Sequence, residues 1–217
     1  MRIPPKYTQV AAVILLGGAT LVTLAVLVFI IVFILEKGLP VITLDFLLTN
    51  PRNMGKEGGI FPTIVGTILL PLIAVGIALP LGVGTAVYLT EYTRETSLTR
   101  FIRFGTDCLA GVPSIIFGLF GFIFFVTILK MGWSLMSGGL TLAIMILPTI
   151  IRTSEEAIRA VPYSFREVSF SLGATRWETV TRTVLPNALP GIVTGVMLGI
   201  GRSIGETAVV IFTAGSS

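Results

Sequence analysis

The residues most able to do chemistry are one arginine and one glutamate inside the last apolar run of the chain. Arg202 and Glu206 interrupt a stretch that begins near residue 187. On a continuous helix, at about 100° per residue, they share a face with Gly191, Gly195 and Gly199. Glycines at every fourth position let another helix approach closely, so this face should point toward a neighbouring helix. We expect the two charges to pair, which would offset part of the roughly 2.5–3.5 kcal/mol cost of an arginine in a membrane.

A guanidinium on such a face is suited to an anion. Its planar, permanently charged fork can hold an oxyanion through two hydrogen bonds, which suits phosphate or sulfate better than a cation or a sugar. We therefore predict that Arg202 and Glu206 line a substrate pathway, in which Glu206 keeps the arginine from holding the anion too tightly. The alternative is that the two charges only neutralise each other structurally.

Composition places these residues in a membrane protein. Of the 217 residues, 53% are hydrophobic and 12% are charged, whereas a typical soluble domain is about 25% charged. Four uncharged runs are each long enough to cross about 30 Å of hydrocarbon, and a fifth is interrupted by Arg202 and Glu206. The four runs are residues 10–35, 60–90, 108–129 and 131–151. We predict an all-α, polytopic transmembrane bundle with five visible spans, forming one domain over residues 1–217.

Several classes of chemistry lack the residues they need. The sequence contains no histidine, which excludes histidine-based triads and histidine metal sites. It also contains no Gly-Lys-Ser or Gly-Lys-Thr, so no P-loop is present. A membrane enzyme would need a cluster of carboxylates, Ser/Lys pairs or metal ligands inside the spans, which offer only Arg202 and Glu206. We expect a chain that is not an enzyme, binds no metal or cofactor, and depends on another chain for ATP.

The distribution of basic residues predicts the orientation. If the N-terminus is cytoplasmic, ten basic residues fall inside and four outside, with Arg202 left in the membrane. The inside residues are Arg2, Lys6, Arg94, Arg100, Arg103, Arg152, Arg159, Arg166, Arg176 and Arg182, and the outside ones are Lys37, Arg52, Lys56 and Lys130. The positive-inside bias also explains much of the net charge of +4 without a nucleic-acid partner. We predict a multi-pass protein of the plasma membrane with its N-terminus in the cytoplasm and Ser217 outside.

The longest polar stretch, residues 152–186, is cytoplasmic in this orientation. At its start, Arg152 with Glu156 and Glu155 with Arg159 are spaced to form two i,i+4 ion pairs. Such pairs stabilise a helix in water, so we expect the fourth spanning helix to continue beyond the bilayer.

Two helix start signals follow within this stretch. Ser164 with Glu167 has the spacing of a capping box, and Gly173 is suited to a left-handed helix stop. Thr175 with Glu178 repeats the capping-box spacing at once. The pattern predicts a folded hairpin of two short helices, which could either dock a partner or lie on the membrane surface.

The same stretch carries a family resemblance. The run REVSFSLGATRWETVTRTVLPNALPG at residues 166–191 resembles the EAA loop of ABC-importer permeases, although Val168 and Ser169 replace the alanines that give the loop its name. The resemblance implies that the loop forms coupling helices that sit in a groove of an ATP-hydrolysing subunit. It assigns this coupling role to Arg166, Glu167, Gly173, Ala174, Thr175, Arg176, Trp177, Leu185 and Pro186.

Further stretches narrow the resemblance to the PstA-type permeases of phosphate transport systems. They are GGIFPTIVGT at 58–67, GVPSIIFGLF at 111–120, LPTIIRTSEEA at 147–157 and GRSIGETA at 201–208. The sister PstC-type permease shares most of this pattern, and a permease for sulfate, molybdate or phosphonate would keep the loop and the topology. These remain the alternatives.

The resemblance implies a MetI-like permease fold and a set of partners. These are a second, PstC-type permease, a dimer of PstB-type ATPase subunits, and an extracytoplasmic PstS-type phosphate-binding protein. It also implies alternating access driven by ATP, with Arg202 and Glu206 associated with translocation. Permeases of this family have six spans, so we expect the last helix to be missing from this sequence.

Overall fold

The computed structural model describes residues 5–53, 57–93 and 96–215, with side chains described from residue 9 onward. Arg2, Lys56 and Arg94 of the charge count, together with Ser216 and Ser217, lie outside the described residues, as does the side chain of Lys6. The chain divides into two compact units, residues 1–61 and 62–217.

The first unit consists of one long helix followed by a short ordered turn. Helix α1 (Pro5–Gly38) is uniformly apolar, and its side chains from residue 9 to residue 37 are exposed. Its 34 residues are more than the roughly 20 that a membrane crossing needs. The exposed apolar surface on every side is typical of a helix that is surrounded by lipid.

A small hairpin closes the first unit. After the 3₁₀ turn η1 (Leu39–Val41), helix α2 (Leu44–Leu48) is followed by strands β1 (Pro51–Arg52) and β2 (Glu57–Gly58), which pair antiparallel. Gly58 has a φ of +86°, and a Cβ on Gly59 would run into the backbone oxygen of Phe46. Only glycine fits both positions, which explains the Gly-Gly pair ahead of the second span.

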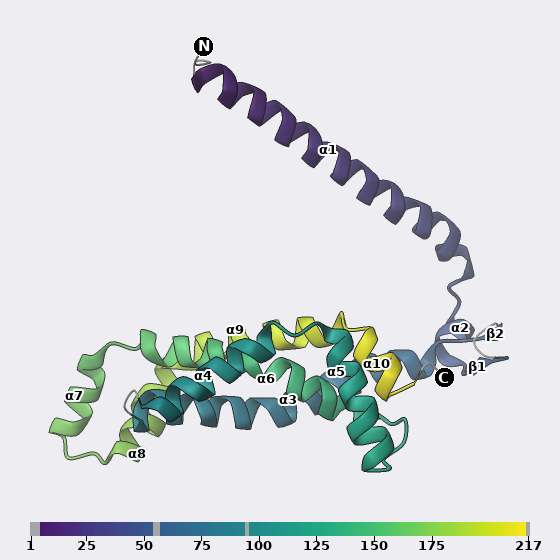
Figure 1. Ribbon diagram of the computed structural model, residues 1–217. Helices are drawn as coiled ribbons and strands as arrows, with labels where there is room; N and C mark the ends of the chain where they lie inside the picture. Colours follow the sequence, from purple (N-terminus) through teal and green to yellow (C-terminus); the bar gives the residue numbers. More distant parts are fainter. Residues whose placement is uncertain (1–4, 54–56, 94–95, 216–217) are drawn as a thin grey trace. The chain divides into compact units, whose positions relative to one another are not determined.

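The second unit is built around helix α6 (Leu135–Ala160). Its most apolar window is 61% buried, against 22% for the span of α3 (Phe61–Val87) and 28% for that of α9 (Leu185–Ile204). Figure 1 shows α4, α6 and α9 running alongside one another within this unit. One buried apolar cluster joins α6 to α3 and α5, and a second joins its last turn to α3 and α9. Helix α6 is therefore the central helix of this unit, and it continues beyond residue 151 to Ala160.

The third predicted span, residues 108–129, is not a straight helix. Helix α4 (Ser97–Ala110) and the segment formed by α5 (Ser114–Gly121) and the π-helical η3 (Phe122–Ile128) meet at an angle of 100°. Gly111 caps α4, and Pro113 disfavours a helical conformation of the residue before it. The described residues thus contain four helices long and apolar enough to cross a membrane, or five if the bent pair is one span. The predicted helical bundle is confirmed.

Small residues set the distance between the central helix and its neighbours. A Cβ added to Gly191 of α9 would lie 2.6 Å from the Cβ of Ala157, and one added to Gly195 would overlap Thr153. On α3, a Cβ at Gly82 would lie 2.7 Å from Ile150. By contrast, a Cβ at Gly199 would find its nearest neighbours at an ordinary 3.7 Å. The packing face predicted on the last helix therefore contacts α6 most tightly at its first two glycines.

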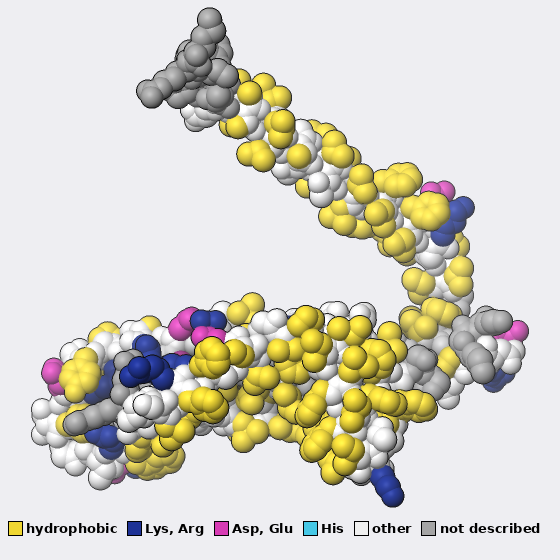
Figure 2. Space-filling model, in the orientation of Figure 1, with side chains coloured by type: hydrophobic (Ala, Val, Ile, Leu, Met, Phe, Trp, Pro, Cys, Tyr) yellow, Lys and Arg dark blue, Asp and Glu magenta, His cyan; other side chains and the backbone are white. Residues whose placement is uncertain are grey.

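Charge is distributed unevenly over the second unit. Figure 2 shows charged side chains gathered at the end that carries α7 (Tyr163–Ser171) and α8 (Arg176–Thr179), and apolar side chains over much of the remaining surface in view. This separation is expected of a helical bundle whose apolar surface lies in lipid and whose charged end lies in water.

Substituting Gly195 by alanine should destabilise the contact between α6 and α9. The new methyl group overlaps the Thr153 side chain, and overpacking of this kind typically costs about 1–3 kcal/mol. We expect a lower melting temperature for the purified protein in detergent. The matched control is Gly201→Ala on the same helix, where the Cβ would meet open space and the helix should gain up to about 1 kcal/mol. Equal melting temperatures for the two variants would contradict the close approach.

Candidate functional site

The proposed pathway charges lie on either side of a break in the last span. Helix α9 ends at Ile204, and Glu206 lies in the segment before the short helix α10 (Ala208–Thr213). The predicted Arg202–Glu206 pair on a continuous helix is therefore wrong, and no ion pair joins the two residues in the described part of the chain. A glycine at position 205 weakens the helix at this point. The following carboxylate then starts a new helix.

Glu206 caps α10. Its Oε1 accepts hydrogen bonds from the backbone N–H groups of Ala208 at 3.1 Å and Val209 at 3.4 Å. These N–H groups have no partner within their own helix, and a negative charge is favourable beside them. Val209 is fully buried in the apolar cluster with α3, α5 and α6. The carboxylate therefore fixes where the chain re-enters the bundle.

Arg202 is the polar group left available by this arrangement. It lies in the last turn of α9, is half-buried, and makes no hydrogen bond or ion pair with any described residue. The carbonyl end of a helix favours a cation, which lowers the cost of placing the guanidinium there. Ser203, the next residue, is buried and donates to the backbone oxygen of Gly199 at 2.9 Å. The guanidinium can thus present its five N–H donors to an anionic ligand.

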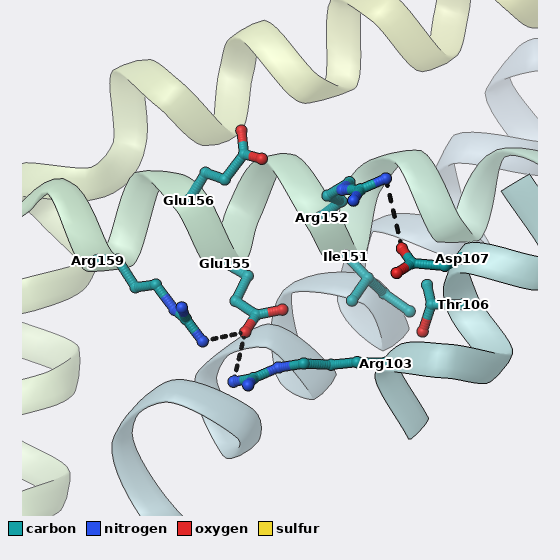
Figure 3. Close-up of a pocket in the computed structure, with 8 residues that line it drawn as sticks. All are labelled: Arg103, Thr106, Asp107, Ile151, Arg152, Glu155, Glu156 and Arg159. Carbon is teal, nitrogen blue, oxygen red and sulfur yellow. Dashed lines mark hydrogen bonds and ion pairs between the residues drawn. The ribbon is translucent and has the colours of Figure 1, made fainter. Parts of the chain in front are cut away.

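A second group of charges lies between α4 and the last two turns of α6 (Figure 3). Glu155 accepts from Arg159 on its own helix and from Arg103 on α4, each at 2.7 Å. Arg152 reaches Asp107 of α4 at 3.3 Å. The predicted Glu155–Arg159 pair is confirmed, whereas the predicted Arg152–Glu156 pair is wrong because α4 offers Arg152 a carboxylate from outside its own helix.

These contacts surround a cavity of about 200 Å³ whose charges balance. Its lining contributes three arginines and three carboxylates, most of them engaged with one another. Arg103 and Asp107 are one helical turn apart, as are Arg152 and Glu155, so the two helices present complementary charges to each other. The spacing was visible in the sequence, but the choice between pairing within a helix and pairing across helices depends on packing. The ion pairs of this charged group hold α4 against α6.

The long polar stretch at residues 152–186 contains a helical hairpin, here defined as residues 163–184. It comprises α7, α8 and the π-helical turn η4 (Val180–Val184), which continues into α9. Gly173 has a φ of +82°, which confirms the predicted left-handed turn. The second capping box is also confirmed, since the Glu178 carboxylate accepts from the Thr175 N–H at 2.9 Å and the Thr175 hydroxyl accepts from the Glu178 N–H at 3.3 Å.

The first predicted capping box is wrong. Helix α7 begins at Tyr163 with Pro162 at its N-cap, and Ser164 lies within the first turn without capping it. Proline fixes its own φ at a value that suits the residue ahead of a helix and needs no hydrogen bond from its nitrogen. It therefore replaces the serine as the start of the helix.

The hairpin has a buried face and an apolar exposed face. Val180 and Val184 are buried, and the hydroxyls of Ser169 and Thr179 lie 2.9 Å apart, which holds α7 against the second limb. Outside, Leu172 is 83% exposed and Trp177 is 65% exposed, and four further large apolar side chains of the hairpin are exposed as well. These are Tyr163, Phe165, Val168 and Phe170. An exposed apolar surface of this kind on a polar segment marks an interaction site.

The predicted coupling residues separate into outward-facing and inward-facing ones. Those exposed are Glu167, Gly173, Thr175, Arg176, Trp177 and Pro186, and those half-buried are Ala174 and Leu185. Arg166 is different, because its side chain is only 9% exposed and pairs with Glu91 at 2.6 Å. Its side chain faces the interior of the bundle rather than solvent, and its coupling role, like that of the other residues, stays a prediction. Glu91 was not anticipated, because nothing local in its sequence marks a partner 75 residues away.

This chain is similar to known proteins in sequence and in fold. Residues 78–217 match the family described as binding-protein-dependent transport system inner membrane component. A probable ABC transporter permease, YqgI of Bacillus subtilis, is 35% identical over 210 residues, which cover 97% of this chain and 71% of the relative. The phosphate transport system permease PstA of Pasteurella multocida is 37% identical over 193 residues, which cover 88% of this chain and 68% of the relative.

Two further likenesses extend the comparison. PstA 1 of Mycobacterium tuberculosis is 38% identical over 160 residues, and the matched part spans about half of that protein (52%). Among solved structures, an inward-facing conformation of the MetNI methionine ABC transporter superposes with a TM-score of 0.57 at 26% identity, covering 68% of each chain. The helical core described above is thus a permease fold.

Removing the Glu206 carboxylate should loosen the start of α10. Glu206→Ala loses the acceptor for the Ala208 and Val209 N–H groups, and loss of a helix cap typically costs about 0.5–2 kcal/mol. We expect faster hydrogen exchange at these two amides, measured by mass spectrometry of the purified protein. Glu206→Gln keeps an oxygen in the same place and should retain most of the protection. Unchanged exchange in the alanine variant would contradict the capping role.

Proposed function

Because this chain belongs to the family of binding-protein-dependent transport system inner membrane components, we propose that it is a membrane-spanning permease subunit of an ATP-driven phosphate importer. The observation that supports phosphate as the substrate is the sequence identity of this chain with phosphate permeases over most of its length. In one case the identity is 37% across 88% of the chain. The protein is a multi-pass membrane protein, and the orientation that fits the importer places its N-terminus in the cytoplasm.

The chemistry of Arg202 supports an oxyanion as the transported species. Its guanidinium lies at a break in a spanning helix without a partner among the described residues. A ligand that brings its own negative oxygens would supply that partner, and a half-buried site strengthens the attraction relative to water. Glu206 accepts hydrogen bonds from the start of α10, and in this way it fixes the position of the break. Its negative charge also weakens the binding of an anion to Arg202, which favours release of the anion.

The hairpin supports coupling to a separate ATPase. Its exposed apolar face, centred on Leu172 and Trp177, offers a docking surface at the charged end of the second unit. ATP binds to that other chain, because the sequence contains no P-loop. We propose a PstB-type ATPase dimer at this face, a PstC-type permease beside the bundle, and a PstS-type binding protein on the outer side.

Phosphate uptake by the assembled importer tests the proposal. The full-length protein and its proposed partners are reconstituted in liposomes, and uptake of radiolabelled phosphate is measured with an excess of sulfate, molybdate or phosphonate. Arg202→Ala should reduce uptake about 10- to 100-fold, the loss expected when a hydrogen bond to a charged group is removed. Arg100→Ala, which alters an exposed arginine on α4, is the control and should transport normally.

Two results would contradict the assignment. Competition by sulfate equal to that by unlabelled phosphate would show that phosphate is the wrong substrate. Normal uptake by a normally assembled Arg202→Ala importer would remove Arg202 from the pathway.

Gly173→Val should uncouple ATP hydrolysis from uptake. Position 173 has open space around it but a φ of +82°, and a left-handed conformation costs a non-glycine residue about 1–2 kcal/mol, more for a β-branched one. We expect the two limbs of the hairpin to reorient and the phosphate moved per ATP to fall. Gly173→Asn, which tolerates this conformation, should retain most of the coupling. An unchanged ratio in the valine variant would argue against docking through this turn.

A further inference from the structure

Glu91 connects the hairpin to a helix that is remote from it in the sequence. The residue lies in the π-helical turn η2 (Tyr88–Tyr92) at the end of α3, and its side chain is 11% exposed. Its carboxylate accepts from the Arg166 Nη2 at 2.6 Å and from the Arg166 Nε at 3.1 Å. The contact is a fork-like ion pair in a nearly buried environment, where such pairs are strong.

Arg166 uses its remaining donors to hold the end of α6. Its Nη1 donates to the backbone oxygen of Val161 at 2.9 Å, and its Nη2 donates to that of Ile158 at 3.0 Å. The last carbonyls of a helix have no partner within the helix, so the guanidinium caps α6 while it binds Glu91. One side chain of α7 thereby joins the ends of α3 and α6.

The second limb of the hairpin reaches the same residue. Arg176, the first residue of α8, donates from its Nη1 to the backbone oxygen of Glu91 at 3.4 Å. Because Ser169 and Thr179 also link α7 to the second limb, the two limbs form one unit. That unit contacts α3 through residue 91 twice, once at its side chain and once at its backbone.

The charges around the pair make Glu91 hard to replace. A cavity beside it is lined by Arg159, Arg166 and Arg176, and among its described lining residues Glu91 is the only carboxylate. Glu155 is engaged by Arg103 and Arg159, and among the described residues Arg166 has no acidic partner other than Glu91. Without Glu91, a buried guanidinium would lose its counter-charge next to two further arginines, and a buried charge without its partner is strongly unfavourable.

We propose that Glu91 is a positioning residue for energy coupling, through which movement of the hairpin is passed to α3. The inference rests on the proposed function in one respect, namely that an ATPase engages the hairpin. Helix α3 packs closely against α6 at Gly82, and its last residues share a buried cluster with the hairpin's Val180 and Val184. Glu91 and Arg166 join the hairpin to α3 and to the end of α6. A displacement of the hairpin therefore moves both helices together, and the bundle opens or closes as one body.

The test compares ATP hydrolysis with uptake in the reconstituted importer. Glu91→Gln should leave the complex assembled and hydrolysing ATP but lower the phosphate moved per ATP at least about tenfold. Glu91→Asp, which keeps the charge, should stay within about threefold of the wild type. In the double variant Glu91→Gln with Arg166→Gln, the loss should equal that of Arg166→Gln alone, because both substitutions remove the same contact. The control is Glu36→Gln, an exposed carboxylate at the end of α1.

Three other outcomes overturn the proposal. If Glu91→Gln moved as much phosphate per ATP as the wild type, the Glu91–Arg166 pair would not pass movement from the hairpin to α3. A proportional fall in hydrolysis and uptake, or failure of both Glu91→Gln and Glu91→Asp to assemble, would assign the pair to folding alone. If the wild-type importer moves sulfate in place of phosphate, the substrate is wrong, but the ratio measured with sulfate still decides the role of Glu91.

Discussion

The close contact between α6 and the helices around it is the constraint on which the second unit depends. In lipid the hydrophobic effect does not drive helices together, so their association depends on van der Waals contact between surfaces that fit. Here the fit comes from glycine facing a side chain, as with Gly195 against Thr153 and Gly82 against Ile150. Because α3 and α9 are both held to one helix in this way, a displacement of the hairpin end of α6 is shared by all three.

Charge is used in two different ways at the two ends of this bundle. At the hairpin end, Arg166, Arg103 and Arg159 are satisfied by carboxylates from neighbouring elements or from their own helix, and they serve as connectors. At the far end of α9, Glu206 is satisfied by backbone N–H groups, and Arg202 has no described protein partner. The same residue types thus connect helices in one place and, in the other, leave an arginine available for the anion site proposed above.

The features that could be predicted from sequence were those determined by neighbouring residues. The turn at Gly173 and the cap formed by Thr175 with Glu178 depend on a few adjacent positions, and both were correctly anticipated. The pairing of Arg152 with Asp107 and of Arg166 with Glu91 depends on which helices pack together, so spacing along the chain paired Arg152 with Glu156 instead and suggested no ion-pair partner for Arg166. The break at Gly205 had a local signal, but a helical projection assumes a continuous helix and conceals it.

The distance in sequence between Glu91 and Arg166 bears on how the protein is made. The carboxylate is synthesised 75 residues before its guanidinium partner, and the whole of α4, α5 and α6 is translated in between. Until α7 emerges, the end of α3 holds an acidic side chain with no counter-ion from the hairpin, which favours keeping that end in the aqueous phase. Closure of the ion pair is therefore a late step of biogenesis, and it can occur only when the helices between the two residues have been inserted with the correct topology.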